Sequence, residues 1–217
     1  MTRPSPSEIA RTFSRLEPHH PQTMLEQLQE YTHFQQLVAT LLSSRTKDTT
    51  TIPIVKRLFT KYHTPRDFLN TRTELLAHDL YGIGFYRVKA RNIQKLSKII
   101  LEEYNGKIPS TVDQLTALPG VGRKTANCML NYAFQQPAIA VDVHVHRIAN
   151  RLGWIQTKTP EETETALQKI IPQPLWIKVN MLLVGHGQTI CFPRNPNCAH
   201  CPILQWCAYG QRQKAYK

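Results

Sequence analysis

The sequence lacks any apolar run that approaches the length of about 20 residues needed to cross a bilayer as a helix. Its first residues, Met-Thr-Arg-Pro-Ser-Pro-Ser-Glu, also lack the apolar core of a secretory signal. We therefore expect a protein that enters no membrane and works in the cytoplasm. Thiols are kept reduced in that compartment, which disfavours structural disulfides.

The alternation of apolar and polar residues that is typical of a half-buried strand is also missing. Helical spacing recurs instead, and one apolar helix face is formed by Phe34, Leu37, Val38, Leu41 and Leu42. A longer helix is expected to bury Val88, Ile93, Leu96, Ile100 and Tyr104. Its solvated side would carry five cations, Arg87, Lys89, Arg91, Lys95 and Lys98. These spacings predict an all-α fold.

Prolines and threonines indicate where several helices begin. Pro53 is tolerated only in the first turn of a helix, so we expect a helix from about Ile54 to Tyr62. Thr64 and Thr159 each precede a proline and are typical N-caps. A chain of 217 residues can build a substantial core without disulfides, as one domain or two small ones.

Acidic side chains are few, with 15 Asp and Glu against 27 Lys and Arg, which gives a formal net charge of +12. A basic balance of this size favours a polyanionic partner, most simply nucleic acid. A merely soluble basic protein is the alternative, and composition does not separate the two.

Four of the five cysteines are crowded near the C-terminus in the pattern C-x6-C-x2-C-x5-C, at Cys191, Cys198, Cys201 and Cys207. This clustering favours a metal site over disulfides, although spacing alone leaves zinc and an iron–sulfur cluster both open. The fifth, Cys128, lies on the apolar face of a predicted helix and is expected to pack in the core.

The stretch Leu118-Pro-Gly-Val-Gly-Arg-Lys-Thr-Ala-Asn127 joins two predicted helices through a turn. Gly120 and Gly122 are expected to adopt backbone conformations that a Cβ would forbid. A glycine turn that opens a helix presents backbone N–H groups that can hold a phosphate, although most Gly-x-Gly turns are only turns. Lys124 falls in the first turn of the helix, where a cation is electrostatically disfavoured.

A similar apolar–turn–Gly-x-Gly–basic pattern occurs 38 residues earlier, from Leu80 to Lys89, and the aromatic Phe85 comes directly after its second glycine. A polar loop at 43–48 carries two cations, Arg45 and Lys47. From the residues alone, Phe85 is more typical of a core aromatic and the loop of a solvated connection.

The hairpin with Lys124, the segment Ala140-Val-Asp-Val-His144 and the four C-terminal cysteines together resemble the endonuclease III family of DNA glycosylases, which repair oxidised bases. The resemblance extends from about Leu25 to Cys207. It implies a two-lobed helix-hairpin-helix glycosylase fold, with a six-helix barrel domain at 26–136 and a discontinuous iron–sulfur cluster domain formed by 1–25 and 137–217. It also implies that the four cysteines hold a [4Fe–4S] cluster.

The chemistry that the resemblance implies is base excision by a bifunctional glycosylase and lyase, acting as a monomer on double-stranded DNA with an oxidised pyrimidine or an abasic site. The damaged nucleotide is flipped out of the duplex, and the amine of Lys124 attacks the sugar C1′ to form a Schiff base. β-Elimination then cleaves the strand on the 3′ side. Asp142 would take the ammonium proton, although it is also a plausible N-cap.

Lys124 has to lose its proton before it attacks. Lowering a lysine pKa from about 10.4 to about 8 requires roughly 3 kcal/mol. A helix N-terminus supplies at most about 2 kcal/mol, so burial or a neighbouring cation such as Arg123 has to contribute as well.

The resemblance also implies contacts with DNA. They involve the 43–48 loop, the wedge residue Phe85, the hairpin and two further side chains, and the candidates are Arg45, Lys47, Phe85, Gly120, Gly122, Arg123, Thr125, His144 and Arg194. Arg45 departs from the family, because many members have Gln there, and Phe85 replaces an aliphatic residue of some relatives. Packing is an alternative for His144, and plain solvation for Arg194.

Two rivals remain. One is a mismatch or oxidised-purine glycosylase on the same fold. The other is a non-catalytic DNA-binding module whose tail is stapled by zinc. If the source is prokaryotic, the enzyme would associate with the nucleoid.

Overall fold

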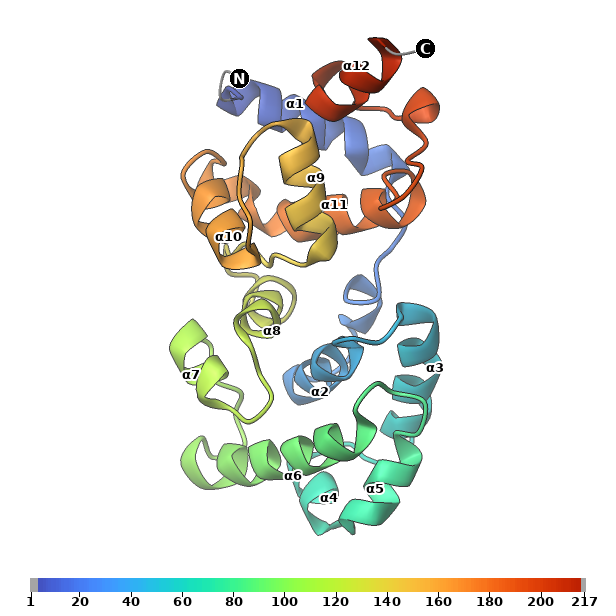
Figure 1. Ribbon diagram of the computed structural model, residues 1–217. Coiled ribbons are helices and arrows are strands. Elements are labelled where there is room, and N and C mark those ends of the chain that lie inside the picture. Colours follow the sequence, from blue (N-terminus) through green and yellow to red (C-terminus); the bar gives the residue numbers. More distant parts are fainter. Residues whose placement is uncertain (1–3, 216–217) are drawn as a thin grey trace. The chain divides into compact units, whose positions relative to one another are not determined.

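The computed structural model describes residues 4–215, and within that range its regular elements are all helical (Figure 1). The predicted all-α fold is therefore confirmed. The chain divides into two compact units, one formed by Met24–Gln135 and the other by the residues up to Thr23 together with those from Gln136 onward. In the described part of the chain, no helix is both long and apolar enough for a membrane span.

The unit Met24–Gln135 is built from seven α-helices with short helical turns at its start and end. In chain order these are η2 (Glu26–Leu28), α2 (His33–Ser43), α3 (Asp48–Phe59), α4 (Pro65–Asn70), α5 (Thr73–Asp79), α6 (Tyr86–Glu103), α7 (Val112–Ala117), α8 (Arg123–Cys128) and the π-helical turn η3 (Met129–Ala133). Helix α2 is the central element, buried from Phe34 to Leu42 and packed against α3, α6, α8 and η3.

Helix α3 begins earlier than the sequence suggested. It starts at Asp48, so Pro53 lies inside the helix and the expected start near Ile54 was wrong. Pro53 is exposed, so the carbonyl that loses its helical donor there can be solvated. Thr64 caps α4 with Pro65 in the first turn, as predicted.

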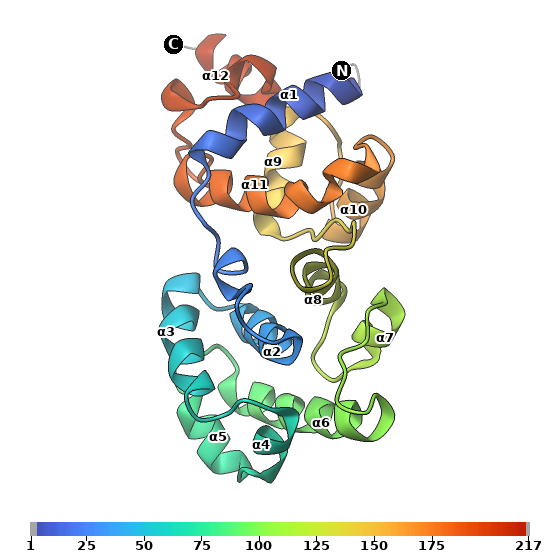
Figure 2. The same ribbon diagram turned by 180° about the vertical axis from the view of Figure 1, so that it is seen from behind.

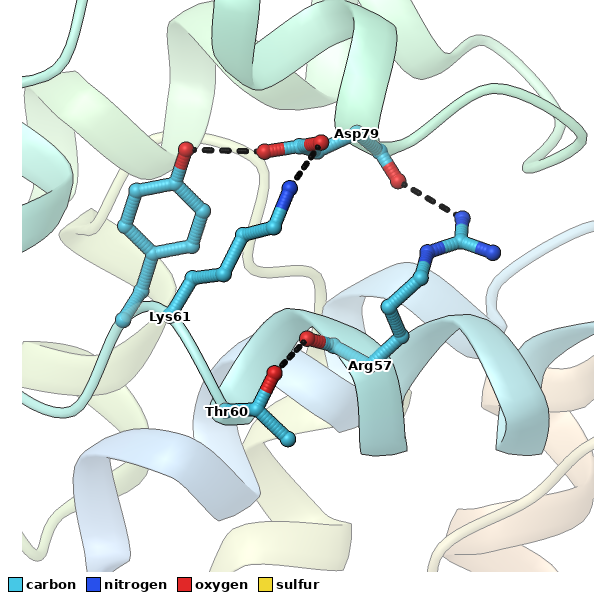
Figure 3. A network of polar contacts seen from close by, with 5 residues as sticks. Arg57, Thr60, Lys61 and Asp79 are labelled. Carbon is cyan, nitrogen blue, oxygen red and sulfur yellow. Dashed lines mark hydrogen bonds and ion pairs between the residues drawn. The ribbon is translucent and has the colours of Figure 1, made fainter.

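A polar network links the end of α3 and the two residues Lys61 and Tyr62 that follow it to Asp79 at the end of α5 (Figure 3). The buried Asp79 carboxylate accepts hydrogen bonds from Lys61 Nζ at 2.8 Å and from the Tyr62 hydroxyl at 2.9 Å, and Arg57 donates to the Asp79 carbonyl at 3.3 Å. Burial alone would raise the pKa of Asp79, but the hydrogen bonds from Lys61 and Tyr62 outweigh it and lower that pKa.

The other unit combines the two ends of the chain. Its elements are α1 (Pro6–Leu16), η1 (Glu17–His19), α9 (Val143–Leu152), α10 (Pro160–Gln168), η4 (Gln173–Leu175), α11 (Trp176–Thr189), η5 (Cys198–His200), η6 (Leu204–Trp206) and α12 (Ala208–Ala215). Helix α9 packs against α10, α11 and α12, and α1 packs against α11 (Figures 1 and 2). Ile9, Phe13 and Leu16 of α1 enter this unit's core.

Candidate active site and cysteine loop

The hairpin between α7 and α8 is closed by a hydrogen bond from the Val121 N–H to the Leu118 carbonyl at 3.1 Å. Gly120 has a φ of +81°, a backbone conformation that favours glycine, and a Cβ there would lie 2.7 Å from Asn92 Nδ2, so the Asn92 side chain would also have to shift. Gly122 is different. Its φ is −90°, and apart from Gly122 itself and its two chain neighbours no heavy atom of the described residues lies within 4 Å of where its Cβ would be. The expectation that Gly122 needs a forbidden conformation was wrong, and its missing side chain leaves open space instead.

Helix α8 begins at Arg123, so Lys124 lies in its first turn as predicted. Arg123 is exposed and Lys124 is half-buried, which gives the amine a partly desolvated position. Thr125 lies within α8 and is only 6% exposed, so its side chain is not part of the exposed surface of the hairpin.

Two other candidates, Arg45 and Phe85, lie together although they are far apart in the sequence. The Arg45 guanidinium is 5.5 Å from the centroid of the Phe85 ring, and both residues have a left-handed backbone, with φ of +54° and +59°. Phe85 is 60% exposed, so it is not the core aromatic that its residue type suggests. Lys47 is the exposed N-cap of α3, next to this pair in the chain.

Glycine allows the two loops to touch. A Cβ on Gly84 would lie 2.8 Å from the Arg45 carbonyl oxygen, and the Gly84 N–H donates to Thr46 Oγ1 at 3.0 Å. Such proximity leaves no room for a side chain. The loop at 43–48 and the turn before α6 therefore form one surface, with Phe85 and Arg45 outward.

Sequence reasoning missed Lys89. It was expected on the solvated side of α6 and Val88 on the buried side, yet Lys89 is 6% exposed and Val88 is 45% exposed. The Lys89 ammonium donates to the carbonyls of Leu42 at 2.9 Å and Ser44 at 2.6 Å. Burial lowers the pKa of Lys89 to about 8. The signal was present, because Lys89 precedes the buried Ile93 by four residues and so shares its helix face.

In the unit that contains both chain ends, Asp142 is the N-cap of α9. Its Oδ1 accepts from the backbone N–H groups of His144 at 2.8 Å and Val145 at 2.9 Å. The carboxylate is half-buried and held rigidly by this cap. The His144 ring lies 3.1 Å from an Arg147 nitrogen and close to Gly187, which favours packing for His144.

The four C-terminal cysteines line one cavity, with about 350 Å³ of space free of protein atoms including its open mouth. No disulfide joins any of the five cysteines, all of which lie in the described part of the chain. Burial, and then the neighbouring thiols, raise the pKa of Cys201 to about 11. Among residues 4–215, no group of three or more His, Cys, Asp or Glu side chains is placed to hold a metal ion.

Arginines of α9 organise the cysteine loop, and their role was not apparent from the sequence. Arg151 donates to Cys191 Sγ at 3.4 Å and to the carbonyls of Phe192 at 2.7 Å and Pro193 at 2.8 Å. Arg147 donates to the Cys191 carbonyl at 2.8 Å. Cations around a thiol favour the thiolate that binds metals. Arg194 is exposed.

Comparison with protein families matches residues 38–173 to the HhH-GPD superfamily of base excision DNA repair proteins. The chain is 46% identical to endonuclease III of Thermotoga maritima over 180 residues, covering 83% of this chain and 84% of the relative. It is 44% identical to endonuclease III of Bacillus subtilis, covering 83% of each.

Among solved structures, the chain is also similar to endonuclease III. A non-covalent endonuclease III–DNA complex matches with a TM-score of 0.88 at 37% identity, covering 98% of this chain and 99% of that one. A trapped covalent endonuclease III–DNA intermediate matches with a TM-score of 0.87 at 37% identity, covering 97% and 99%.

Proposed function

The chain belongs to the HhH-GPD superfamily of base excision DNA repair proteins, and from that premise we propose that it removes oxidised pyrimidines such as thymine glycol and cleaves DNA 3′ to abasic sites through a Schiff base on Lys124. The enzyme is a DNA glycosylase and AP lyase that binds DNA, as its relatives indicate.

The observation that carries the proposal is the place of Lys124. The residue lies in the matched range, in the first turn of α8, half-buried beside the exposed Arg123. A covalent intermediate of a 37%-identical relative with DNA requires a nucleophile, and a partly desolvated amine is suited to attack C1′.

The proposed reaction begins when the neutral amine of Lys124 forms a bond to C1′ and the damaged base leaves with the electrons of the glycosidic bond. The sugar ring then opens: the C1′–O4′ bond breaks, O4′ keeps its electrons and takes up a proton, and the nitrogen lone pair forms the C=N bond of the Schiff base. This protonated Schiff base acidifies the C2′ proton. Loss of that proton expels the 3′ phosphate and breaks the strand. Asp142 is proposed to accept the ammonium proton and to stabilise positive charge on the sugar, because the α9 cap holds its carboxylate in one orientation.

We further propose that the 43–48 loop and the hairpin bind the duplex. Arg45 and Phe85 would fill the gap left by the flipped nucleotide. Lys47 and Arg123 are exposed cations suited to phosphates. The open space beside Gly122 lets a phosphate approach the backbone, next to the turn at Gly120. Exposed Arg194 would add a phosphate contact, and a DNA role for His144 is the weaker one given its packing.

The four cysteines have the donors that a [4Fe–4S] cluster needs, because four thiols line one cavity beside Arg151 and the Gly210 N–H. Their sulfurs do not form a metal-binding group among the described residues, so the fit is one of donor chemistry and not of geometry. When bound, such a cluster would crosslink the loop from Cys191 to Cys207. Analysis of the purified protein should find iron and acid-labile sulfide in equal amounts. Equimolar zinc without sulfide would contradict this part of the proposal.

Borohydride trapping tests the reaction, because borohydride reduces a Schiff base to a permanent crosslink. Wild type should crosslink to a thymine glycol duplex, and Lys124→Ala should not. Lys98→Ala is the matched control, since Lys98 is an exposed lysine on α6. Crosslinking to an abasic duplex but not to the thymine glycol duplex would support the lyase activity and refute the proposal that oxidised pyrimidines are the substrate. Binding without crosslinking to either would favour a non-catalytic DNA-binding module.

A further inference from the structure

The loop between α2 and α3 contains a tight turn with an unusual occupant. The Thr46 N–H donates to the Ser43 carbonyl at 3.1 Å, Ser44 has φ −59° and ψ 127°, and Arg45 has φ +54°. These angles define a type II turn, whose third position ordinarily takes glycine or asparagine. A non-glycine residue held in a sparsely populated region costs about 1–3 kcal/mol unless its surroundings enforce it.

The contacts around the turn indicate what holds Arg45 in its left-handed conformation. Types I and II differ chiefly by a rotation of the peptide between the second and third residues, so the carbonyl of the second residue points to opposite sides. Here that carbonyl belongs to Ser44, and Lys89 Nζ donates to it at 2.6 Å. The same ammonium donates to Leu42 at the end of α2 at 2.9 Å, where the helix dipole favours a cation.

The other side of the turn is fixed by the segment that opens α6. The Gly84 N–H binds Thr46 Oγ1, and the glycine lies against the Arg45 carbonyl. With its backbone held from both sides, the Arg45 side chain stands over the exposed Phe85 ring, 5.5 Å from its centroid. Both anchors, Lys89 and Gly84, come from one short stretch of sequence, as does Phe85.

We propose that Lys89 is a positioning residue, which holds the 43–46 turn in its type II form so that Arg45 and Phe85 meet the duplex as one preassembled wedge. The wedge itself rests on the proposed function. The conformational role of Lys89 does not, because it follows from the contacts within the unit Met24–Gln135.

The test compares Lys89→Met with Lys98→Met, which removes an exposed lysine from the same helix. Under single-turnover conditions on a thymine glycol duplex, Lys89→Met should lower trapping by about tenfold at subsaturating enzyme, whereas the control should change little. Combined with Arg45→Ala, Lys89→Met should add less than about twofold, because residues that act through one contact are not additive. An equal fold-loss in both backgrounds would overturn the proposal.

A second readout needs no activity. The one-bond Cα–Hα coupling of Arg45 reports the sign of its φ by NMR, and Lys89→Met should shift it toward a negative φ while Lys98→Met leaves it unchanged. An Arg45 that keeps its positive φ without Lys89 would refute the positioning role, even if wild type traps no DNA at all. If Lys89→Met does not fold, Lys89→Gln replaces it, because its amide can satisfy one carbonyl and should give an intermediate shift.

Discussion

Two Gly-x-Gly turns, 82–84 and 120–122, begin helices in the same unit and use their glycines differently. At the first turn, Gly84 is pressed against the backbone of another loop and the following Phe85 is exposed. At the second, Gly122 faces open space and the following basic residues begin α8. The first turn therefore exposes the Phe85 side chain to solvent, whereas the second exposes the backbone at Gly122. One sequence pattern serves two purposes, and the neighbours of the second glycine decide which.

The largest expected difference is in borohydride trapping, between substitutions of the two lysines that follow these turns, Lys124 and Lys89. Lys124→Ala is expected to abolish borohydride trapping on both thymine glycol and abasic duplexes, because it removes the proposed nucleophile. Lys89→Met should retain trapping at saturating enzyme. Residual trapping by Lys124→Ala equal to that of Lys89→Met would erase the distinction between a nucleophile and a positioning residue.

Gly84→Ala should destabilise the protein by about 2 kcal/mol or more, because its Cβ would lie far inside contact distance of a backbone oxygen that has little freedom to move. Urea denaturation measures this free energy of unfolding. A loss below 0.5 kcal/mol, roughly the scale of an ordinary surface substitution, would show that the two loops are not locked together.

The burial of Lys89 should appear as a pH dependence of stability. Its folded-state pKa of about 8 lies below the ordinary value of 10.5 for an unburied lysine, so between these values the unfolded chain binds more protons. The free energy of unfolding of wild type should therefore rise with pH across this window, by about 1 kcal/mol per unit relative to Lys89→Met. Parallel profiles for the two proteins between pH 8 and 10 would contradict the burial of this amine.

Gly122→Ala should have the smallest effect on stability, within about 0.5 kcal/mol of wild type, since its φ suits any residue and no described atom opposes a Cβ. It should nevertheless weaken binding to an abasic duplex, measured by fluorescence anisotropy. Gly106→Ala is the control, because the space beside it is also open among the described residues but its φ of +79° is unfavourable for alanine. Gly106→Ala should lose stability and keep affinity, the opposite of Gly122→Ala.

Local patterns predicted much of this molecule. The threonine–proline caps at Thr64 and Thr159 and the start of α8 all depend on residues close in sequence. The start of α3 was predicted too late because Pro53 lies on the exposed face of the helix, where water can solvate the backbone carbonyl that loses its hydrogen-bond donor. Lys89 was predicted to be exposed because lysine is a charged residue, although its position four residues before the buried Ile93 places it on the buried face of α6.

The remaining features arise from tertiary contacts and have no local signal. Nothing in the 43–48 loop indicates that Gly84 will touch it, or that Arg45 will adopt a left-handed backbone with its guanidinium over Phe85. The same holds for Arg151, which reaches the cysteine loop across 40 residues of sequence. Such contacts depend on which distant segments of the chain pack together, and the residues on either side of each position do not reveal that.

The helix α1 has a consequence for synthesis on the ribosome. Its apolar residues Ile9, Phe13 and Leu16 are made before the segment Met24–Gln135, whereas the α9 and α11 residues that share their core are made after it. The intervening segment Met24–Gln135 is continuous and can fold while translation proceeds. The apolar face of α1 therefore stays uncovered until α9 and α11 have been made, and we expect chaperones to bind it during that interval, at a surface that the finished enzyme buries.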